Sequence, residues 1–171
     1  NFKEFKNALE ILGISTLNFV YADREDNIYY VSNGGFPYRN PKYNWSGILP
    51  GNTSETLWGE KTIPLDSLPQ VLNPKGGWVF NTNNTPYSAT DSLSNFKETS
   101  LNKIMGYQSK GLENNRSSRF LELISQYDSL SYSDFKRIKY DNQYPSKMTT
   151  PKAINLEDLM HLDASKYPDI S

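Results

Sequence analysis

A long stretch without helical or strand periodicity, residues 34–74, most constrains what this chain can fold into. It is dense in Gly, Pro and Asn and contains Trp45 and Trp58. Loops of this length inside a compact domain are uncommon and are usually functional. We therefore expect an excursion of the chain over a sheet, with a short helical turn at residues 65–68. The same excursion could also contact other segments of a larger protein.

Regular elements are predicted before this excursion. Asn1 and Glu4 form a capping box for an amphipathic helix that ends at Gly13. The apolar face of this helix consists of Phe2, Phe5, Leu9 and Leu12. Residues 16–22 and 28–32 are rich in β-branched and aromatic side chains and are joined by a charged turn, which predicts a β-hairpin.

Further elements are predicted after the excursion. A buried strand is expected at residues 77–82, around an apolar run. Helical periodicity follows at residues 96–105 and 117–127, and Ser131 can cap a third helix. The tail holds one short helical candidate at residues 156–162. Together these elements predict an α+β fold, in which antiparallel strands are followed by helices.

The length of 171 residues is that of one domain. We expect a single partial domain over residues 1–171. In it, residues 1–86 contain the first helix, the hairpin, the excursion and the buried strand, and residues 87–171 are mainly helical with an irregular tail. The chain starts directly in a helix, without Met or a signal peptide, so we expect a fragment or a processed piece of a larger protein.

Charge and cysteine content exclude several function classes. The chain has 18 Lys and Arg against 19 Asp and Glu, so its net charge of -1 gives no attraction to nucleic acid or an anionic membrane. No apolar run in the sequence approaches the roughly 18 residues that span a bilayer. Because there is no cysteine, disulfides, thiolate zinc sites and a Cys nucleophile are excluded. Nucleic acid and membranes are therefore not expected as partners.

Patterns typical of triads and metal sites are weak. His161 is the single histidine and no G-x-S-x-G stretch occurs, so neither a Ser-His-Asp triad nor a zinc site is supported. Asp23, Glu25 and Asp26 lie close together but lack the Gly and the terminal Glu of an EF-hand loop. We interpret these three residues as a charged hairpin turn.

Aromatic residues are abundant, with 12 Tyr and 3 Trp. We expect Trp45, Trp58 and Trp78 to be core anchors beneath the excursion, because buried aromatic rings hold irregular backbone in place. The alternative is a noncatalytic saccharide- or peptide-binding module that stacks ligands on exposed Tyr and Trp. The two readings differ in their predictions, since Trp58 and Trp78 would be exposed and coplanar in a binding module.

A cluster of amides, Asn81, Asn83 and Asn84, follows the apolar run at residues 78–80. A carboxamide is uncharged and cannot serve as an ordinary base or nucleophile, but it can donate hydrogen bonds. A rigidly held N–H donor can stabilise the negative charge that develops on a carbonyl oxygen during acyl transfer, which contributes roughly 3 to 4 kcal/mol per donor. The alternative is that these side chains cap a turn, as Asx turns do.

Three stretches in this order resemble a known family. They are TLNFVYADREDNIYYVSNGGFPYR at residues 16–39, IPLDSLPQVLNPKGGWVFNTNNTP at residues 63–86 and NNRSSRFLELI at residues 114–124. As an ordered set they are similar to the β-subunit of the penicillin acylase family, which includes penicillin acylases and acyl-homoserine lactone acylases. The resemblance covers about residues 1–140, and this chain would be a middle fragment of the β-subunit.

The resemblance implies an N-terminal nucleophile (Ntn) hydrolase with an αββα sandwich that cleaves N-acyl amide bonds. In this family a self-cleaving precursor exposes a Ser whose own α-amine acts as the base. The family's oxyanion-hole Asn matches Asn83, and a nearby family Arg matches Arg116. Asn84 would be a structural neighbour.

This chain lacks several parts that a complete member of the family would have. The nucleophilic Ser and the second oxyanion donor would lie upstream of Asn1, so the resemblance implies that this chain is inactive alone. Its implied partners are the remaining α- and β-subunit segments of the same precursor and a small N-acyl amide substrate. The chemistry needs no cofactor. A structural calcium ion is possible in the full-length enzyme, with Asp91 as a candidate ligand, and a periplasmic or secreted location is implied.

Overall fold

The computed structural model describes residues 1–14, 16–97, 99, 114–148 and 163–166. The chain divides into two compact units, residues 1–117 and 118–171. The described residues of the first unit form an N-terminal helix, a small sheet, the excursion and the first turn of a later helix, and those of the second unit are mainly helical. The single partial domain expected over the whole chain stays a prediction.

Helix α1 (Phe2–Glu10) begins at the predicted capping box. The Oδ1 atom of Asn1 accepts the backbone N–H of Glu4 at 3.0 Å, and the Glu4 carboxylate accepts from the N-terminal ammonium group at 3.4 Å. The end of the helix differs from the prediction. The helix ends at Glu10 rather than near Gly13, and Leu12, with a φ of 53°, takes the left-handed conformation common after a helix.

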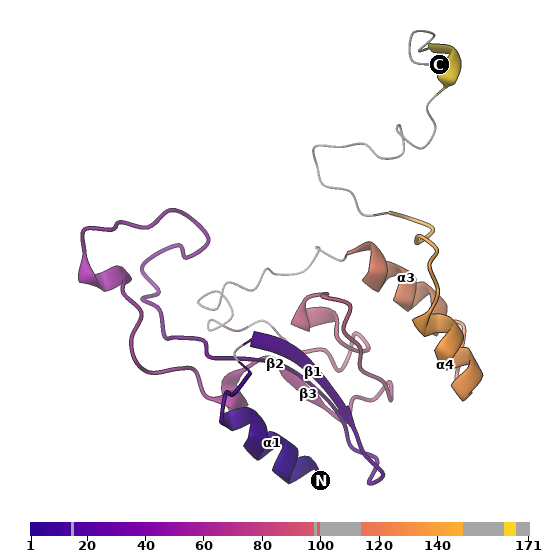
Figure 1. Ribbon diagram of the computed structural model, residues 1–171, viewed down its shortest axis with the longest axis horizontal. Coiled ribbons are helices and arrows are strands. Elements are labelled where there is room, and N and C mark those ends of the chain that lie inside the picture. The colour runs from indigo at the N-terminus through magenta and orange to yellow at the C-terminus, as the bar shows by residue number, and fades with distance from the viewer. Residues whose placement is uncertain (15, 98, 100–113, 149–162, 167–171) are drawn as a thin grey trace. The chain divides into compact units, whose positions relative to one another are not determined.

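Helix α1 lies beside the sheet (Figure 1), and aromatic side chains pack between them. The ring of Phe5 stacks on Tyr21 with centroids 4.6 Å apart and meets Phe19 edge to face at 6.2 Å. The odd-numbered aromatic residues of the first strand therefore face the helix, because side chains alternate along a strand. The buried residues of this core are Leu9, Tyr29, Val31, Ile63, Leu65 and Leu68.

The sheet has three antiparallel strands in the order β1-β2-β3. They are β1 (Thr16–Ala22), β2 (Ile28–Gly34) and β3 (Gln70–Leu72). Strand β1 pairs with β2 along its whole length, with Tyr21 opposite Tyr29. The predicted hairpin is confirmed, and its second strand is longer at the C-terminal end than the sequence pattern indicated.

The charged turn between β1 and β2 is organised by Asp23. Its Oδ1 atom accepts the backbone N–H groups of Glu25 at 2.9 Å and Asn27 at 3.0 Å, and its Oδ2 atom accepts from the Tyr21 hydroxyl at 2.8 Å. Desolvation raises the pKa of Asp23, but the bonds from Asn27, Tyr21 and Glu25 outweigh it and lower the pKa to about 2. The predicted role as a hairpin turn is therefore confirmed for this carboxylate.

The excursion contains two short 3₁₀ turns, Ser54–Thr56 and Leu65–Ser67, and the second one confirms the predicted turn. Its middle part extends away from the sheet in Figure 1, so it does not cover the sheet as expected. Its returning end supplies β3, which the sequence pattern did not predict. A strand of three residues is too short to show alternation.

Residues 77–82, predicted as a strand, do not form one. The backbone N–H of Phe80 donates to the carbonyl of Ala89 at 3.0 Å, and Thr90 Oγ1 donates to the carbonyl of Trp78 at 2.7 Å. These bonds attach the segment to the loop that follows it. An apolar run becomes a strand where a neighbour supplies a regular ladder of backbone partners, and the third strand of this sheet is β3 instead.

The tryptophans are less buried than predicted. Trp58 is 64% exposed, which contradicts its expected place in the core, and Trp45 and Trp78 are half-buried. The guanidinium of Arg39 lies 5.4 Å from the ring centre of Trp45 and 5.2 Å from that of Trp58. A cation over the ring faces holds these side chains together while leaving them partly in water, which explains the difference.

The second unit contains most of α3 (Asn115–Ile124) and all of α4 (Tyr132–Lys139). Both helices were predicted, and the Ser131 cap is confirmed because its Oγ atom accepts the N–H of Asp134 at 3.1 Å. None of the helices in the described part of the chain combines the length and apolar composition that crossing a bilayer requires.

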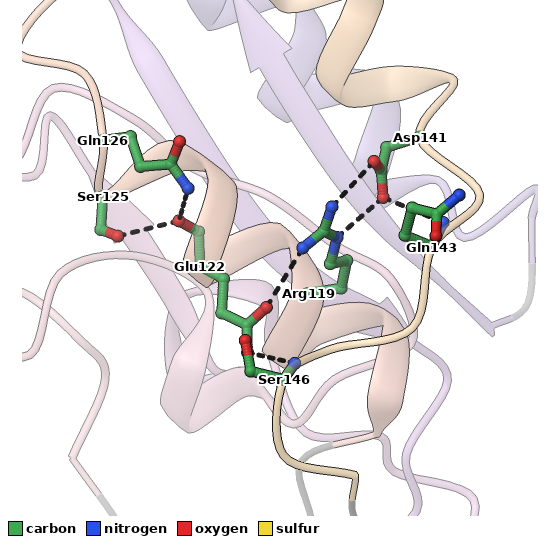
Figure 2. Close-up of polar contacts among 7 residues, drawn as sticks. All are labelled: Arg119, Glu122, Ser125, Gln126, Asp141, Gln143 and Ser146. Atoms are coloured by element: carbon green, nitrogen blue, oxygen red, sulfur yellow. Dashed lines mark hydrogen bonds and ion pairs between the residues drawn. The ribbon is translucent and has the colours of Figure 1, made fainter.

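A charged cluster fastens the segment after α4 to α3 (Figure 2). The guanidinium of Arg119 donates to both carboxylate oxygens of Asp141 at 2.8 and 3.0 Å and forms an ion pair with Glu122 at 3.4 Å. The Glu122 carboxylate also accepts the backbone N–H of Ser146 at 2.7 Å. The hydrogen bonds and charge of Arg119 lower the pKa of Asp141, with desolvation opposing them.

Three sequence-based predictions concern residues that the structure does not describe. His161 and the short helix at residues 156–162 lie outside the described residues. The helix predicted at residues 96–105 falls largely outside them as well. These predictions stay untested.

Candidate functional site

The amides predicted to carry chemistry form a tight loop, residues 81–84, called the amide loop below. Asn84 is its structural member and is 4% exposed. Its Oδ1 atom accepts the N–H of Thr82 at 2.8 Å, and its Nδ2 atom donates to the carbonyl of Ser88 at 3.0 Å. Both ends of this carboxamide are therefore used in local backbone bonding.

Asn83 differs from Asn84 in both exposure and conformation. It is exposed and has a φ of 65°, in the left-handed region that few residues other than Gly adopt. Asn tolerates this region better than most residues do. Its backbone N–H donates to Asn81 Oδ1 at 3.2 Å, which helps to hold the turn.

Arg116 contacts Asn83 across a long stretch of sequence. The Nη2 atom of Arg116 donates to Asn83 Oδ1 at 2.8 Å. Because a guanidinium can donate but not accept, this contact identifies the carbonyl end of the carboxamide and turns the NH₂ end elsewhere. No described residue accepts a hydrogen bond from Asn83 Nδ2. Among the described residues, that group is therefore a donor without an acceptor.

The first turn of α3, which carries Arg116, is attached to the amide loop through Asn114. The Oδ1 atom of Asn114 accepts the N–H of Ser117 at 3.0 Å, the bond of a helix N-cap. Its Nδ2 atom donates to the carbonyl of Thr82 at 3.0 Å. The helix cap Asn114 and the turn residue Asn81 thus support the pair formed by Asn83 and Arg116.

A cavity of about 590 Å³ opens beside the amide loop. It is lined by Leu17 and Asn18 of β1, by Phe36, and by Asn81 and Asn83 of the loop. Its apolar lining comes from Leu17, Phe36 and Pro86, and polar side chains of the strands and the amide loop make up the rest. A small molecule with an apolar group next to a carbonyl fits this division.

The candidate metal ligand, Asp91, is occupied with backbone groups. Its Oδ2 atom accepts the N–H of Gly76 at 2.9 Å, and its Oδ1 atom accepts from Leu93 and Ser94 at 3.0 Å each. Desolvation raises the pKa of Asp91, but these bonds outweigh it and lower the pKa. Within the described ranges, no group of three or more His, Cys, Asp or Glu side chains could hold a metal ion. The calcium assignment stays a prediction.

Sequence reasoning and structure agree on which residues come together and differ on what supports them. Asn83 and Arg116, both named from the family resemblance, are in direct contact. The bond from the Asn83 N–H to Asn81 Oδ1 is the Asx turn that the sequence offered as an alternative, whereas the supporting role of Asn114 was missed. The signal available for Asn114 was its place just before a helical pattern, where Asn is a preferred cap. Its bond to a distant carbonyl has no signal in the sequence.

Comparison with known proteins gives one family. The sequence profile described as penicillin amidase matches residues 1–166. Penicillin G acylase of Escherichia coli is 37% identical to this chain over 79 residues, which are 44% of this chain and 9% of that protein.

A solved structure shares the fold. The thermostable penicillin G acylase from Alcaligenes faecalis superposes with a TM-score of 0.57 and 24% sequence identity, over 81% of this chain. The match covers 22% of that chain, so the present chain spans a small part of both relatives.

Proposed function

The chain belongs to the penicillin amidase family and has the α+β fold of one part of its αββα Ntn hydrolase sandwich, and from this we propose that it contributes the oxyanion-binding side of an amide hydrolase. The observation that carries the proposal is the Asn83 carboxamide, whose oxygen is held by Arg116 while no residue that the structure describes accepts from its NH₂ group. In this proposal the chain is inactive alone.

The proposed reaction is acyl transfer to a Ser at the N-terminus of another segment. The Ser hydroxyl attacks the carbonyl carbon of an N-acyl amide, its proton passes to the α-amine of the same Ser, and the carbonyl oxygen gains negative charge. Asn83 Nδ2 donates a hydrogen bond to that oxygen in the tetrahedral intermediate. Such a donor is worth roughly 3 to 4 kcal/mol in an acyl-transfer site.

Arg116 supports this donor in two ways. It fixes the orientation of the Asn83 carboxamide, so that no energy is spent on turning the donor when the charge develops. Its positive charge also polarises the Asn83 carbonyl, which makes the N–H groups at the other end stronger donors. Arg116 is therefore a positioning residue in this proposal.

The cavity beside the amide loop suggests how substrate would lie. Its apolar wall at Leu17 and Phe36 would contact the acyl group, and its amide end would face the scissile bond. A small N-acyl amide, of the penicillin or acyl-homoserine lactone type, is the substrate class that we propose. The remaining α- and β-subunit segments of the precursor would be its partners, and its location would be periplasmic or secreted.

Replacing Asn83 by Ala in the complete enzyme tests the proposal. We expect kcat for amide hydrolysis to fall about a hundredfold or more, because one oxyanion donor is lost while the fold is kept. Steady-state kinetics and the extent of precursor self-cleavage are the measurements. Asn142→Ala, which removes an exposed amide in the second unit, is the control. A parental kcat in Asn83→Ala would contradict the assignment.

The alternative of a noncatalytic binding module requires both Trp58 and Trp78 to be exposed, and only one of them is. Trp58 is exposed, as that alternative requires. Trp78 is half-buried and packs against Phe80 with ring centres 5.7 Å apart. Membership in the penicillin amidase family therefore makes the hydrolase the better supported function.

A further inference from the structure

We propose that Asn114 is a positioning residue for the Asn83–Arg116 pair. Its carboxamide joins the first turn of α3 to the amide loop and thereby sets the contact between the two side chains. This inference rests on the proposed function, in which Asn83 donates to the substrate oxygen.

Each end of the Asn114 carboxamide serves a different piece of chain. The oxygen accepts the backbone N–H of Ser117 at 3.0 Å, within the same helical turn. The nitrogen donates to the carbonyl oxygen of Thr82 at 3.0 Å, across a separation of 32 residues. The Ser117 hydroxyl donates back to the carbonyl of Asn114 at 2.8 Å, which ties the cap residue to the turn from both sides.

The bond to Thr82 acts directly on the conformation of Asn83. The carbonyl of Thr82 and the N–H of Asn83 belong to one planar peptide group. Asn114 holds the oxygen of this group, and Asn81 Oδ1 holds its N–H at 3.2 Å. With both ends fixed, the peptide plane cannot rotate freely. The left-handed φ of 65° at Asn83 is then maintained although this region is unfavourable for a residue with a Cβ atom.

Asn114 also sets the position of the Arg116 guanidinium. Arg116 lies two positions after Asn114, and its long side chain loses rotamer entropy when it is held at one contact. Fixing the backbone of that turn against Thr82 brings the guanidinium within 2.8 Å of Asn83 Oδ1. Asn114 therefore controls both partners, the loop through a carbonyl and the helix through a cap.

This double use explains why Asn, rather than another good cap residue, occupies the position. Asp and Ser also accept the N–H at the third helical position. An ionised Asp has no hydrogen to donate, and Ser has a single short hydroxyl group. A residue that served as a cap alone would be replaceable by either of them.

The test compares Asn114→Asp with Asn114→Ser in the complete enzyme that contains this chain. Both variants keep the cap acceptor for Ser117 and lose the amide donor to Thr82, and one is charged while the other is neutral. We expect kcat to fall roughly ten- to a hundredfold in both, with KM nearly unchanged, because a displacement of about 1 Å is enough for losses of that size. The melting temperature should stay close to that of the parent.

A double-mutant cycle with Arg116 adds a measurement that would show no coupling if Asn114 were only a helix cap. In an Arg116→Ala background, Asn114→Ser should cost much less than in the parent, because the contact that Asn114 supports is already gone. Crystal structures of the Asn114→Ser variant should show the Arg116–Asn83 hydrogen bond lost or lengthened.

The outcomes separate this inference from the proposed function. If Asn83→Ala lowers kcat but both Asn114 variants keep the parental kcat, Asn114 is a cap alone and the inference fails by itself. If Asn83→Ala has no effect, the proposed function fails first. Failure of both Asn114 variants to fold, or an unchanged Arg116–Asn83 bond in the crystal, would also overturn the positioning role.

Discussion

The carboxamide of Asn83 has an accepting end and a donating end, and its neighbours treat the two differently. Arg116 occupies the oxygen, and the described residues leave the nitrogen without an acceptor. Asn84, the next residue along the chain, has both ends engaged with the backbone. At the scale of single residues, two adjacent amides of the same type therefore have different uses, and their surroundings decide which is which.

Asp23 gives a prediction about pH. Its pKa is lowered from 3.8 to about 2 in the folded protein, so its ionised form contributes stability above the ordinary pKa. This contribution should be lost as the pH falls from about 4 to about 2, because protons then bind the unfolded chain first. We expect Asp23→Asn to melt at a lower temperature than the parent at pH 7, and the gap to close at pH 2.

Thermal unfolding followed by circular dichroism over this pH range is the measurement for Asp23. A suitable control is Asp66→Asn, whose exposed carboxylate pairs with Lys6 at 2.9 Å. That exposed pair should contribute little. A melting-temperature gap between parent and Asp23→Asn that does not depend on pH would contradict the prediction.

Secondary elements with strong local signals were predicted well. Helix α1 and helix α4 each begin at a capping residue that the sequence shows directly, and the hairpin has alternating aromatic residues on one strand. The strand prediction for residues 77–82 was wrong because a strand also requires a neighbouring strand to pair with, which no local pattern reveals. Strand β3 was missed for the complementary reason, since its pairing with β2 is long-range and its length is short.

A further prediction concerns Gly76, in the segment before the amide loop. A Cβ atom at this position would lie 2.9 Å from Asp91 Oδ2 and 3.1 Å from Trp78 Nε1, closer than side chains normally approach. We expect Gly76→Ala to destabilise the protein by about 1 to 3 kcal/mol, because the loop must move to make room.

Chemical denaturation measures the effect at Gly76. Gly51→Ala is a matched control, because a Cβ atom there would meet nothing within 4 Å. Equal stability of the two variants would show that the loop between Gly76 and Asp91 adjusts without cost.

The whole chain carries apolar surface that a complete protein of this family would be expected to cover. In the excursion Ile48 is fully exposed and Leu57 is 71% exposed, next to Trp58. Contiguous exposed apolar groups promote association in water. The chain also spans a small share of both relatives, 9% of one and 22% of the other.

We therefore expect the isolated chain to self-associate through the excursion. Sedimentation velocity over a range of concentrations should show oligomers, and Leu57→Asp should reduce them because it places a charge in the contact. Leu93→Asp, at an exposed leucine outside the excursion, is the control and should have a smaller effect. A monomer at every concentration would rule out the excursion as a docking surface.

The sequence by itself determined the elements whose causes are local: the helix caps at Asn1 and Ser131, the alternating hairpin and the turn at Asp23. Through the family motifs it also singled out Asn83 and Arg116 as candidate site residues. The tertiary structure alone decided the left-handed turn at Asn83, the bridge made by Asn114 and the exposure of Trp58. These features depend on groups far apart in the chain, whose hydrogen bonds and ring contacts form only when folding brings them together.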